Sequence, residues 1–93
     1  PTAATLQTRV RDGATIGANC TIGPGIELGA FCMVGMGSVV TANVPAHALV
    51  FGNMARLHGI VCRCGELVGK ATGGTVPEGD HACRRGRAVR WPQ

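Results

Sequence analysis

A period of six residues runs through the middle of the chain and constrains its fold more than any other feature. Glycine follows four consecutive members of an aliphatic series, and the fourth residue after each aliphatic is mostly small, as at Ala14, Cys20 and Ser38. The period excludes an amphipathic helix, which repeats about every 3.6 residues, and turn pairs typical of hairpins are scarce. The aliphatic series is Val10, Ile16, Ile22, Leu28, Val34 and Val40, and the glycines are Gly17, Gly23, Gly29 and Gly35.

Such a period fits a parallel β-helix with a triangular cross-section. Three flat strands joined by tight corners make one coil of 18 residues, with each aliphatic side chain pointing inward and glycine providing backbone freedom at the corner. The sequence therefore predicts an all-β fold with about two coils over residues 10–45. Val10, Ile16 and Ile22 are expected to stack under Leu28, Val34 and Val40 respectively.

Composition limits the remaining possibilities. With 93 residues the chain forms one small domain, and it contains only three aromatic residues, Phe31, Phe51 and Trp91. It has no apolar run that could span a bilayer and no signal-peptide layout, so we expect a soluble, cytoplasmic protein with no membrane partner. The chain begins at Pro1, which indicates either removal of the initiator methionine or the tail of something longer.

Two segments carry a more specific signature. The stretches GATIGANCTIG (13–23) and VGMGSVVTANVPAHALVFGNMAR (34–56), with the LHGIV that follows, resemble the carboxy-terminal coils of hexapeptide-repeat acyltransferases. The resemblance is closest to nucleotide-sugar N-acetyltransferases of the UDP-2,3-diamino-glucuronate type and covers about residues 5–65. It implies a left-handed β-helix and acetyl transfer from acetyl-CoA, with an amino sugar nucleotide as acceptor. Met54 departs from the family pattern, which has proline there, and this loosens the turn before Arg56.

The resemblance also implies a cofactor site. In this family three subunits lie side by side, acetyl-CoA occupies the groove between neighbouring β-helices, and backbone amides of a GxG corner bind the pantetheine arm. The matching positions here are Gly35, Met36, Gly37 and Ser38, while Arg56 is suited to the phosphates of coenzyme A through its planar guanidinium group. The alternative is that the two glycines only turn a corner and that Arg56 lies on a solvated turn.

The catalytic base is not assigned by the sequence. His47 lies at a turn position that varies in the family, and His58 follows Arg56 in a segment that packs on the coils. Neither matches the family's catalytic histidine, which belongs to an earlier coil that this sequence does not contain. We expect structural or surface roles for both, and we expect the sugar-nucleotide site to lie in the missing coils.

The five cysteines divide into two groups. Cys20 and Cys32 take the small inward position of different coil faces, where they act as small hydrophobic side chains. The other three occur as CRCG and HACRRG, so that Cys62, Cys64, His81 and Cys83 together provide four ligands for a tetrahedral, structural Zn²⁺. Some relatives of the family carry a CxCG…CxCG zinc ribbon at this place in the chain. In this sequence His81 would replace one of the ribbon's cysteines. The alternative is free thiols in a ribbon that has lost its metal.

The expected layout has three parts. Residues 1–61 hold the β-helix, with a lead (1–9), the coils (10–45) and an extended exit and docking segment (46–61); a zinc-ribbon-like extension (62–85) and a basic tail (86–93) follow. The extension covers one open end of the coils and nothing covers the other, which favours a longer enzyme or pairing with another chain. Because trimerisation buries flat faces of a small domain, we expect a homotrimer.

Three functions remain in competition. The first is an acyl-CoA-dependent acyltransferase, or the cofactor-binding end of one, and the second is a non-catalytic trimeric scaffold. The third is a zinc-ribbon nucleic-acid binder, suggested by a net charge of +4 and by four arginines near the carboxyl end, at Arg84, Arg85, Arg87 and Arg90. The shortage of aromatic side chains for stacking on bases argues against the third.

Overall fold

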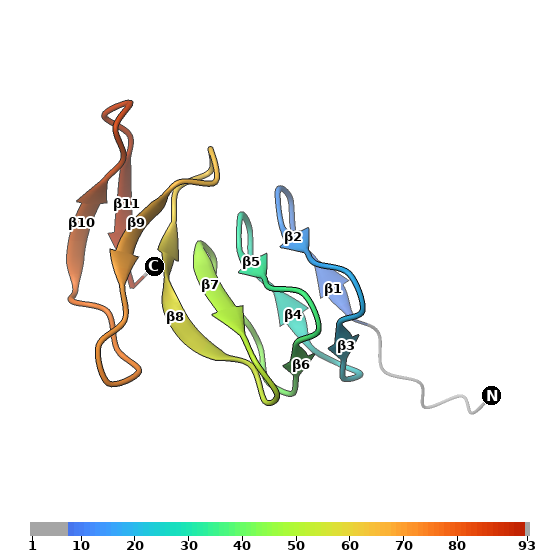
Figure 1. Cartoon of the computed structure of the whole chain (residues 1–93). Helices are drawn as coiled ribbons and strands as arrows, with labels where there is room; N and C mark the ends of the chain where they lie inside the picture. The colour runs from blue at the N-terminus through green and yellow to red at the C-terminus, as the bar shows by residue number, and fades with distance from the viewer. Residues whose placement is uncertain (1–7, 93) are drawn as a thin grey trace.

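The computed structural model describes residues 8–92, and within them the chain is all-β. Eleven strands and no helix occur in this part of the chain, so nothing in it resembles a membrane-spanning helix. Figure 1 shows the strands stacked in a row from β1–β3 to the hairpin of β10 and β11. The strands are β1 (Arg9–Val10), β2 (Thr15–Ile16), β3 (Thr21–Ile22), β4 (Glu27–Leu28), β5 (Met33–Val34), β6 (Val39–Val40), β7 (Ala48–Phe51), β8 (Arg56–Val61), β9 (Leu67–Lys70), β10 (Gly79–Ala82) and β11 (Ala88–Trp91).

The first six strands form the two predicted coils. They pair in parallel as β1 with β4, β2 with β5 and β3 with β6, and every pair is offset by the expected coil length. The aliphatic side chains stack as predicted, with Val10 paired to Leu28, Ile16 to Val34 and Ile22 to Val40. The six-residue repeat is therefore a three-sided parallel β-helix.

A third, shorter turn follows where the sequence analysis placed an extended segment. β7 pairs in parallel with β5, with Val34 opposite Val50, and isolated bridges join Leu28 to Val44 and Val39 to Asn53. The coils therefore continue to Asn53 instead of ending at residue 45. Counting by sixes fails here because the inward residue after Val40 is Val44, only four positions later, so this corner is two residues shorter.

The corner residues with a positive φ are not the glycines directly after the aliphatic residues, which the sequence analysis expected, but lie two residues later. The residue three places after six of the inward aliphatics has a positive φ, and non-glycine residues fill three of these six positions; the shortened corner after Val40 is an exception. The glycines directly after the aliphatic residues have ordinary φ values, so backbone freedom does not explain them. A Cβ at these positions meets the next turn, and at Gly29 it would overlap the backbone of Ala46. The positive-φ positions are Gly13 (73°), Asn19 (61°), Gly25 (73°), Phe31 (58°), Gly37 (69°) and His47 (65°).

Two glycine substitutions separate these requirements. We expect Gly29→Ala to lower the free energy of unfolding by about 1–3 kcal/mol, since the turns must move apart to admit the methyl group. Gly37→Asn is the matched control: no atom lies within 4 Å of a Cβ at Gly37, and Asn19 already has a positive φ at the equivalent corner, so we expect a change within about 0.5 kcal/mol. Urea denaturation followed by circular dichroism measures both. Equal midpoints for the two variants would contradict the steric explanation.

The hydrophobic core begins at the second coil and continues into the extension. Leu28, Val34 and Val40 are at most 2% exposed, whereas Val10 is 54% and Ile16 is 41% exposed because no turn within residues 8–92 covers them. At the other end β8 pairs antiparallel with β7, and β9 with β8, so one side of the β-helix becomes a five-stranded sheet in the order β2-β5-β7-β8-β9. The same core includes Val76 and Cys83 of the extension. It also includes Val89 and Trp91 of β11, so the segment expected as a basic tail is packed as a strand.

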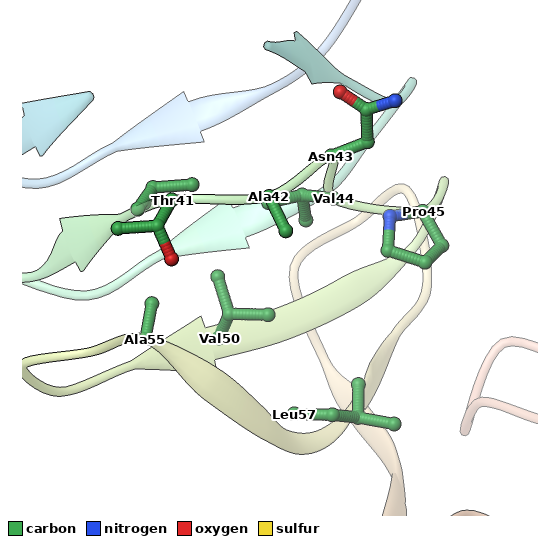
Figure 2. Close-up of a pocket in the computed structure, with 9 residues that line it drawn as sticks. Thr41, Ala42, Asn43, Val44, Pro45, Val50, Ala55 and Leu57 are labelled. Atoms are coloured by element: carbon green, nitrogen blue, oxygen red, sulfur yellow. The ribbon is translucent and has the colours of Figure 1, made fainter. Parts of the chain in front are cut away.

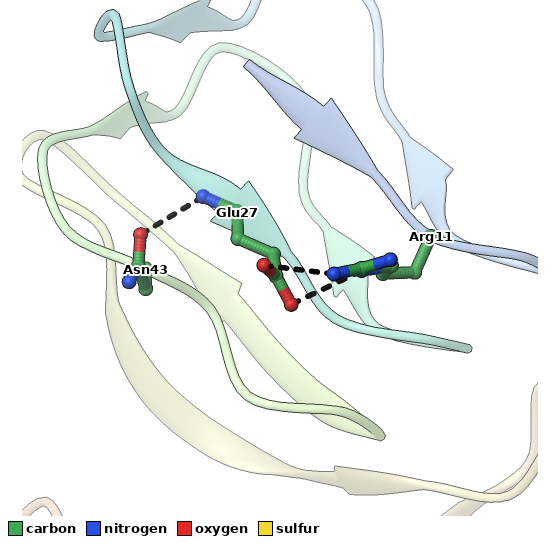
Figure 3. A network of polar contacts seen from close by, with 3 residues as sticks. All are labelled: Arg11, Glu27 and Asn43. Carbon is green, nitrogen blue, oxygen red and sulfur yellow. Dashed lines mark hydrogen bonds and ion pairs between the residues drawn. The ribbon is translucent and has the colours of Figure 1, made fainter. Parts of the chain in front are cut away.

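A polar network also links the three turns along one corner (Figure 3). The guanidinium group of Arg11 donates two hydrogen bonds to the carboxylate of Glu27, at 3.1 and 3.2 Å, and the backbone N–H of Glu27 donates to Oδ1 of Asn43 at 2.8 Å. The hydrogen bonds from Arg11 hold the pKa of Glu27 below its ordinary value. Because both side chains are exposed, this network aligns the corner more than it stabilises the fold.

Candidate functional site

The predicted cofactor corner lies between β5 and β6. The N–H of Gly35 donates to the carbonyl of Val50, and the N–H of Gly37 donates to the carbonyl of Ala18, each at 2.9 Å. These two amides therefore bind the neighbouring turns of the same chain. Among residues 8–92 no partner is seen for the N–H of Met36, whose residue is 78% exposed.

Ser38 belongs to the interior of the β-helix. It is fully buried, and its hydroxyl donates to the carbonyl of Gly35 at 2.6 Å and accepts from the N–H of Gly52 at 3.3 Å. The thiol of Cys20, one coil below, donates to the same Gly35 carbonyl at 3.1 Å. Ser38 thus joins the second and third turns and holds the GxG corner in place.

The structure places Arg56 close to this corner through an aromatic residue that the sequence analysis did not single out. Arg56 begins β8 and pairs with Phe51, and a Cβ on Gly35 would lie 2.8 Å from that of Phe51. The Phe51 ring is stacked on His58, with ring centroids 3.5 Å apart and planes 7° apart. The rarity of aromatic residues, together with the position of Phe51 directly before the GNMAR motif, could have identified it.

These residues form one exposed surface, which we call the GxG face. It comprises Met36 in the corner, and Phe51 and Arg56 opposite each other beside Gly35, all three exposed. Exposed apolar side chains near one cation suit a ligand with an apolar arm and an anionic end. This is the chemistry expected of a pantetheine arm attached to phosphates.

A small apolar cavity lies on the other side of the third turn (Figure 2). It has a volume of about 160 Å³ and is enclosed by the loop of residues 41–45 and by Val40, Val50, Ala55 and Leu57. Sites for drug-sized ligands are typically about 300–1,000 Å³. The cavity can therefore admit a small apolar group, but it is too small for a whole cofactor.

A second cavity, of about 370 Å³, lies between the coils and the extension and is lined by Phe31, His47, Cys62, Arg63, Arg87, Ala88 and Val89. The His47 ring is stacked against Phe31, and its Nδ1 lies 2.8 Å from the carbonyl of Val61. Because a carbonyl only accepts, Nδ1 carries the proton. His47 therefore joins the third turn to β8, which is a structural role.

The predicted metal ligands are brought together only in part. The thiol sulfurs of Cys62, Cys64 and Cys83 all lie within 4.8 Å of one another. His81 is not a member of this group: its Nε2 lies 2.8 Å from the carbonyl of Pro77. The structure therefore assembles three thiols from two separate turns, and the imidazole expected as the fourth ligand is engaged elsewhere.

The three thiols influence one another's ionisation. The hydrogen bond with the Cys64 thiol raises the pKa of Cys62, with a sulfur–sulfur distance of 2.8 Å. Burial disfavours the thiolate of Cys83, but hydrogen bonds from the backbone N–H groups of Arg87 and Arg85 outweigh it and hold the pKa of Cys83 below its ordinary value. Such N–H groups also stabilise thiolates that bind a metal ion.

Comparisons with known proteins agree with the geometry of the coils. Residues 7–42 match the model of the hexapeptide repeat of succinyl-transferase. A dTDP-3-amino-3,6-dideoxy-alpha-D-galactopyranose 3-N-acetyltransferase of Aneurinibacillus thermoaerophilus is 52% identical over 58 residues, which are 62% of this chain and 30% of that protein. The chain thus spans less than a third of the length of this relative.

Two solved structures from Vibrio cholerae are similar as well. A serine acetyltransferase aligns with a TM-score of 0.63 and 35% identity, over 67% of this chain and 24% of that one. A hexapeptide-repeat acetyltransferase complexed with acetyl coenzyme A aligns with a TM-score of 0.60 and 33% identity, over 61% of this chain and 31% of that one.

Proposed function

Because the β-helical part of this chain belongs to the hexapeptide-repeat acyltransferase family, we propose that it is the coenzyme-A-binding end of an acetyl-CoA-dependent acyltransferase. The observation that carries the proposal is the GxG face, where an exposed corner, an aromatic ring and the Arg56 guanidinium group lie together. The similar Vibrio protein that was solved with acetyl coenzyme A supports this ligand.

The proposed roles of the site residues follow from their positions. Met36 presents a free N–H and an apolar side chain to the pantetheine arm, and Arg56 binds the phosphates. Gly35, Gly37 and Ser38 shape the corner from within, because their hydrogen-bonding groups contact neighbouring turns. Gly35 also leaves the space that Phe51 fills.

The proposed acceptor is the amine of an amino sugar nucleotide. The name of the Aneurinibacillus relative supports this choice, whereas the serine acetyltransferases among the similar structures have an amino acid in their name. Incubation with acetyl-CoA and either dTDP-3-amino-3,6-dideoxygalactose or L-serine, followed by mass spectrometry of the products, separates the two. Acetylation of serine alone would contradict the amino-sugar assignment.

We also propose a homotrimer in the cytoplasm, with acetyl-CoA in the groove between neighbouring subunits. The exposed apolar side chains of Met36, Phe51 and Met54 support burial against a second subunit. All five cysteines are free, which fits a reducing compartment. Light scattering coupled to size-exclusion chromatography measures the assembly, and a stable monomer would contradict it.

The second candidate is a non-catalytic trimeric scaffold. The positions of the three histidines favour it, because His47 and His81 each contact a backbone carbonyl and His58 is stacked on Phe51. Of the three, His58 lies beside the GxG face, where it is exposed and its ring stacks on Phe51. Acetyl-CoA binding without any acetylated product would favour this scaffold, or a cofactor-binding end that requires further coils for catalysis.

A further inference from the structure

The extension contains two copies of one turn. In the first turn, the N–H of Cys62 donates to the carbonyl of Glu66 at 2.9 Å, and the N–H of Gly65 donates to the carbonyl of Cys62 at 2.8 Å. In the second turn, the N–H of Cys83 donates to the carbonyl of Arg87 at 2.9 Å, and the N–H of Gly86 donates to the carbonyl of Cys83 at 2.9 Å. Both glycines have positive φ values, 91° at Gly65 and 80° at Gly86.

The equivalence extends to the sulfur atoms. The N–H of Cys64 donates to the sulfur of Cys62 at 3.2 Å, and the N–H of Arg85 likewise faces the thiol of Cys83. Position by position, Cys62 corresponds to Cys83, and Cys64 corresponds to Arg85. Two such turns facing each other offer four ligand positions, of which three hold cysteine and one holds arginine.

The three thiols are close enough together to bind one metal ion. Zinc–sulfur bonds are about 2.3 Å long, which places tetrahedral sulfur ligands roughly 3.8 Å apart. The sulfurs here all lie within 4.8 Å of one another, and the Cys62 and Cys64 sulfurs, 2.8 Å apart, would separate by about 1 Å on binding. Cys62 and Cys83 are buried. Arginine does not bind cations, so the fourth position has no ligand from the described residues.

We propose that Cys62, Cys64 and Cys83 bind one Zn²⁺ whose fourth coordination position is open to a small exchangeable ligand from solution, such as water, hydroxide or a thiol. Soft thiolates favour zinc over hard cations. Zinc with three thiolates carries one negative charge, which the surrounding arginines offset. These are Arg63, Arg84, Arg85 and Arg87, all exposed in the two turns.

This site differs from the closed structural centre expected from the sequence. That centre requires His81, which contacts the carbonyl of Pro77 and stays outside the group of thiols. An open position makes the ion more easily removed and more accessible to external ligands than a four-cysteine ribbon. The proposal is independent of acetyl transfer, since it concerns the extension alone.

Completing the fourth position is the first test. The metal-free, reduced chain of 93 residues is titrated with Zn²⁺ in competition with a chromophoric chelator, and Arg85→Cys is expected to bind zinc at least tenfold more tightly than the original chain. Arg84→Cys is the matched control, because it adds a thiol one residue away, at the position equivalent to Arg63, and should leave the affinity unchanged. Equal affinities of the two variants would overturn the assignment, as would a lack of zinc binding by the original chain.

Cobalt(II) provides a test of the open position. The original chain should bind one Co²⁺ with a thiolate-to-cobalt charge-transfer band, and 2-mercaptoethanol should shift its visible d–d bands. The bands of Arg85→Cys should not shift, because its fourth ligand is already present. His81→Ala should keep the spectrum of the original chain; loss of cobalt as complete as in Cys83→Ser would assign the fourth position to His81 instead.

Discussion

Replacing Val34 by aspartate is expected to remove a large part of the free energy of unfolding. Val34 is 1% exposed and lies between Ile16 below and Val50 above, in the middle of the aliphatic stack. A carboxylate there has no polar partner and no path to water, so the cost is about 3–5 kcal/mol. That is comparable with the whole stability of a small domain, on the order of 5–15 kcal/mol.

Val10→Asp is the matched control for this prediction. Val10 has the same inward position in the repeat, but it is 54% exposed because no turn of the described part of the chain lies beneath it, so we expect a loss below about 1 kcal/mol. Thermal and urea denaturation followed by circular dichroism compare the two. Similar midpoints would mean that the inward positions are not equivalent members of one stack.

The pH dependence gives this comparison a second readout. Burial raises the pKa of the new carboxyl group in the folded protein above its unfolded value of about 3.9. The destabilisation of Val34→Asp is therefore fully present above the folded pKa and shrinks as the pH falls toward the unfolded one. A penalty that grows on acidification would contradict burial of the group.

Arg56→Ala is expected to have the largest effect on cofactor binding. A charge-assisted hydrogen bond to phosphate contributes about 1.5–3 kcal/mol, so the dissociation constant for acetyl-CoA should rise about 10- to 100-fold. The fold should not change, because Arg56 is an exposed residue at the start of β8. Arg56→Lys should recover part of the affinity, since lysine keeps the charge but loses the planar fork.

Arg9→Ala is the control for charge. It removes the same unit charge from an exposed position of β1, on the face that β1 forms with β4, away from the GxG corner. Its dissociation constant should stay within about twofold of the original, because solvent and salt screen distant charges. Equal losses of affinity in the two variants would indicate general electrostatic attraction in place of a phosphate contact at Arg56.

The regular part of the fold could be predicted from the sequence because one period dictates it. Each coil adds the same length, so the partners of Val10, Ile16 and Ile22 followed from counting. The third turn departs from the period of six, because its first corner is shorter and Val44 follows Val40 after only four positions. A repeat predicts only as far as its spacing is kept.

The site was less accessible to sequence reasoning. The motif indicated the corner at Gly35 and the cation at Arg56, but the side chain of Ser38 turned out to be buried, and Phe51 between them was overlooked. Hydrogen-bonding partners of individual amides depend on neighbouring turns that no local pattern describes.

The metal ligands show the same limit. Ligand counting selected His81 because histidine binds zinc, whereas the repeated hydrogen bonds of the two turns make Arg85 equivalent to Cys64 in the proposed site. The correspondence between CRCG and CRRG was present in the sequence. The inference that Cys64 and Arg85 are equivalent depends on the equal backbone geometry of both turns, which only the structure shows.

Calorimetric titration of the chain with acetyl-CoA tests the central claim most directly. We expect saturable binding of one acetyl-CoA per chain, with a dissociation constant on the order of 1 μM to 1 mM, as is common for enzyme substrates, and weaker binding to Arg56→Ala measured alongside. A folded protein, verified as a trimer by light scattering, that releases no heat of binding with millimolar acetyl-CoA would contradict the assignment of the GxG face as a coenzyme A site.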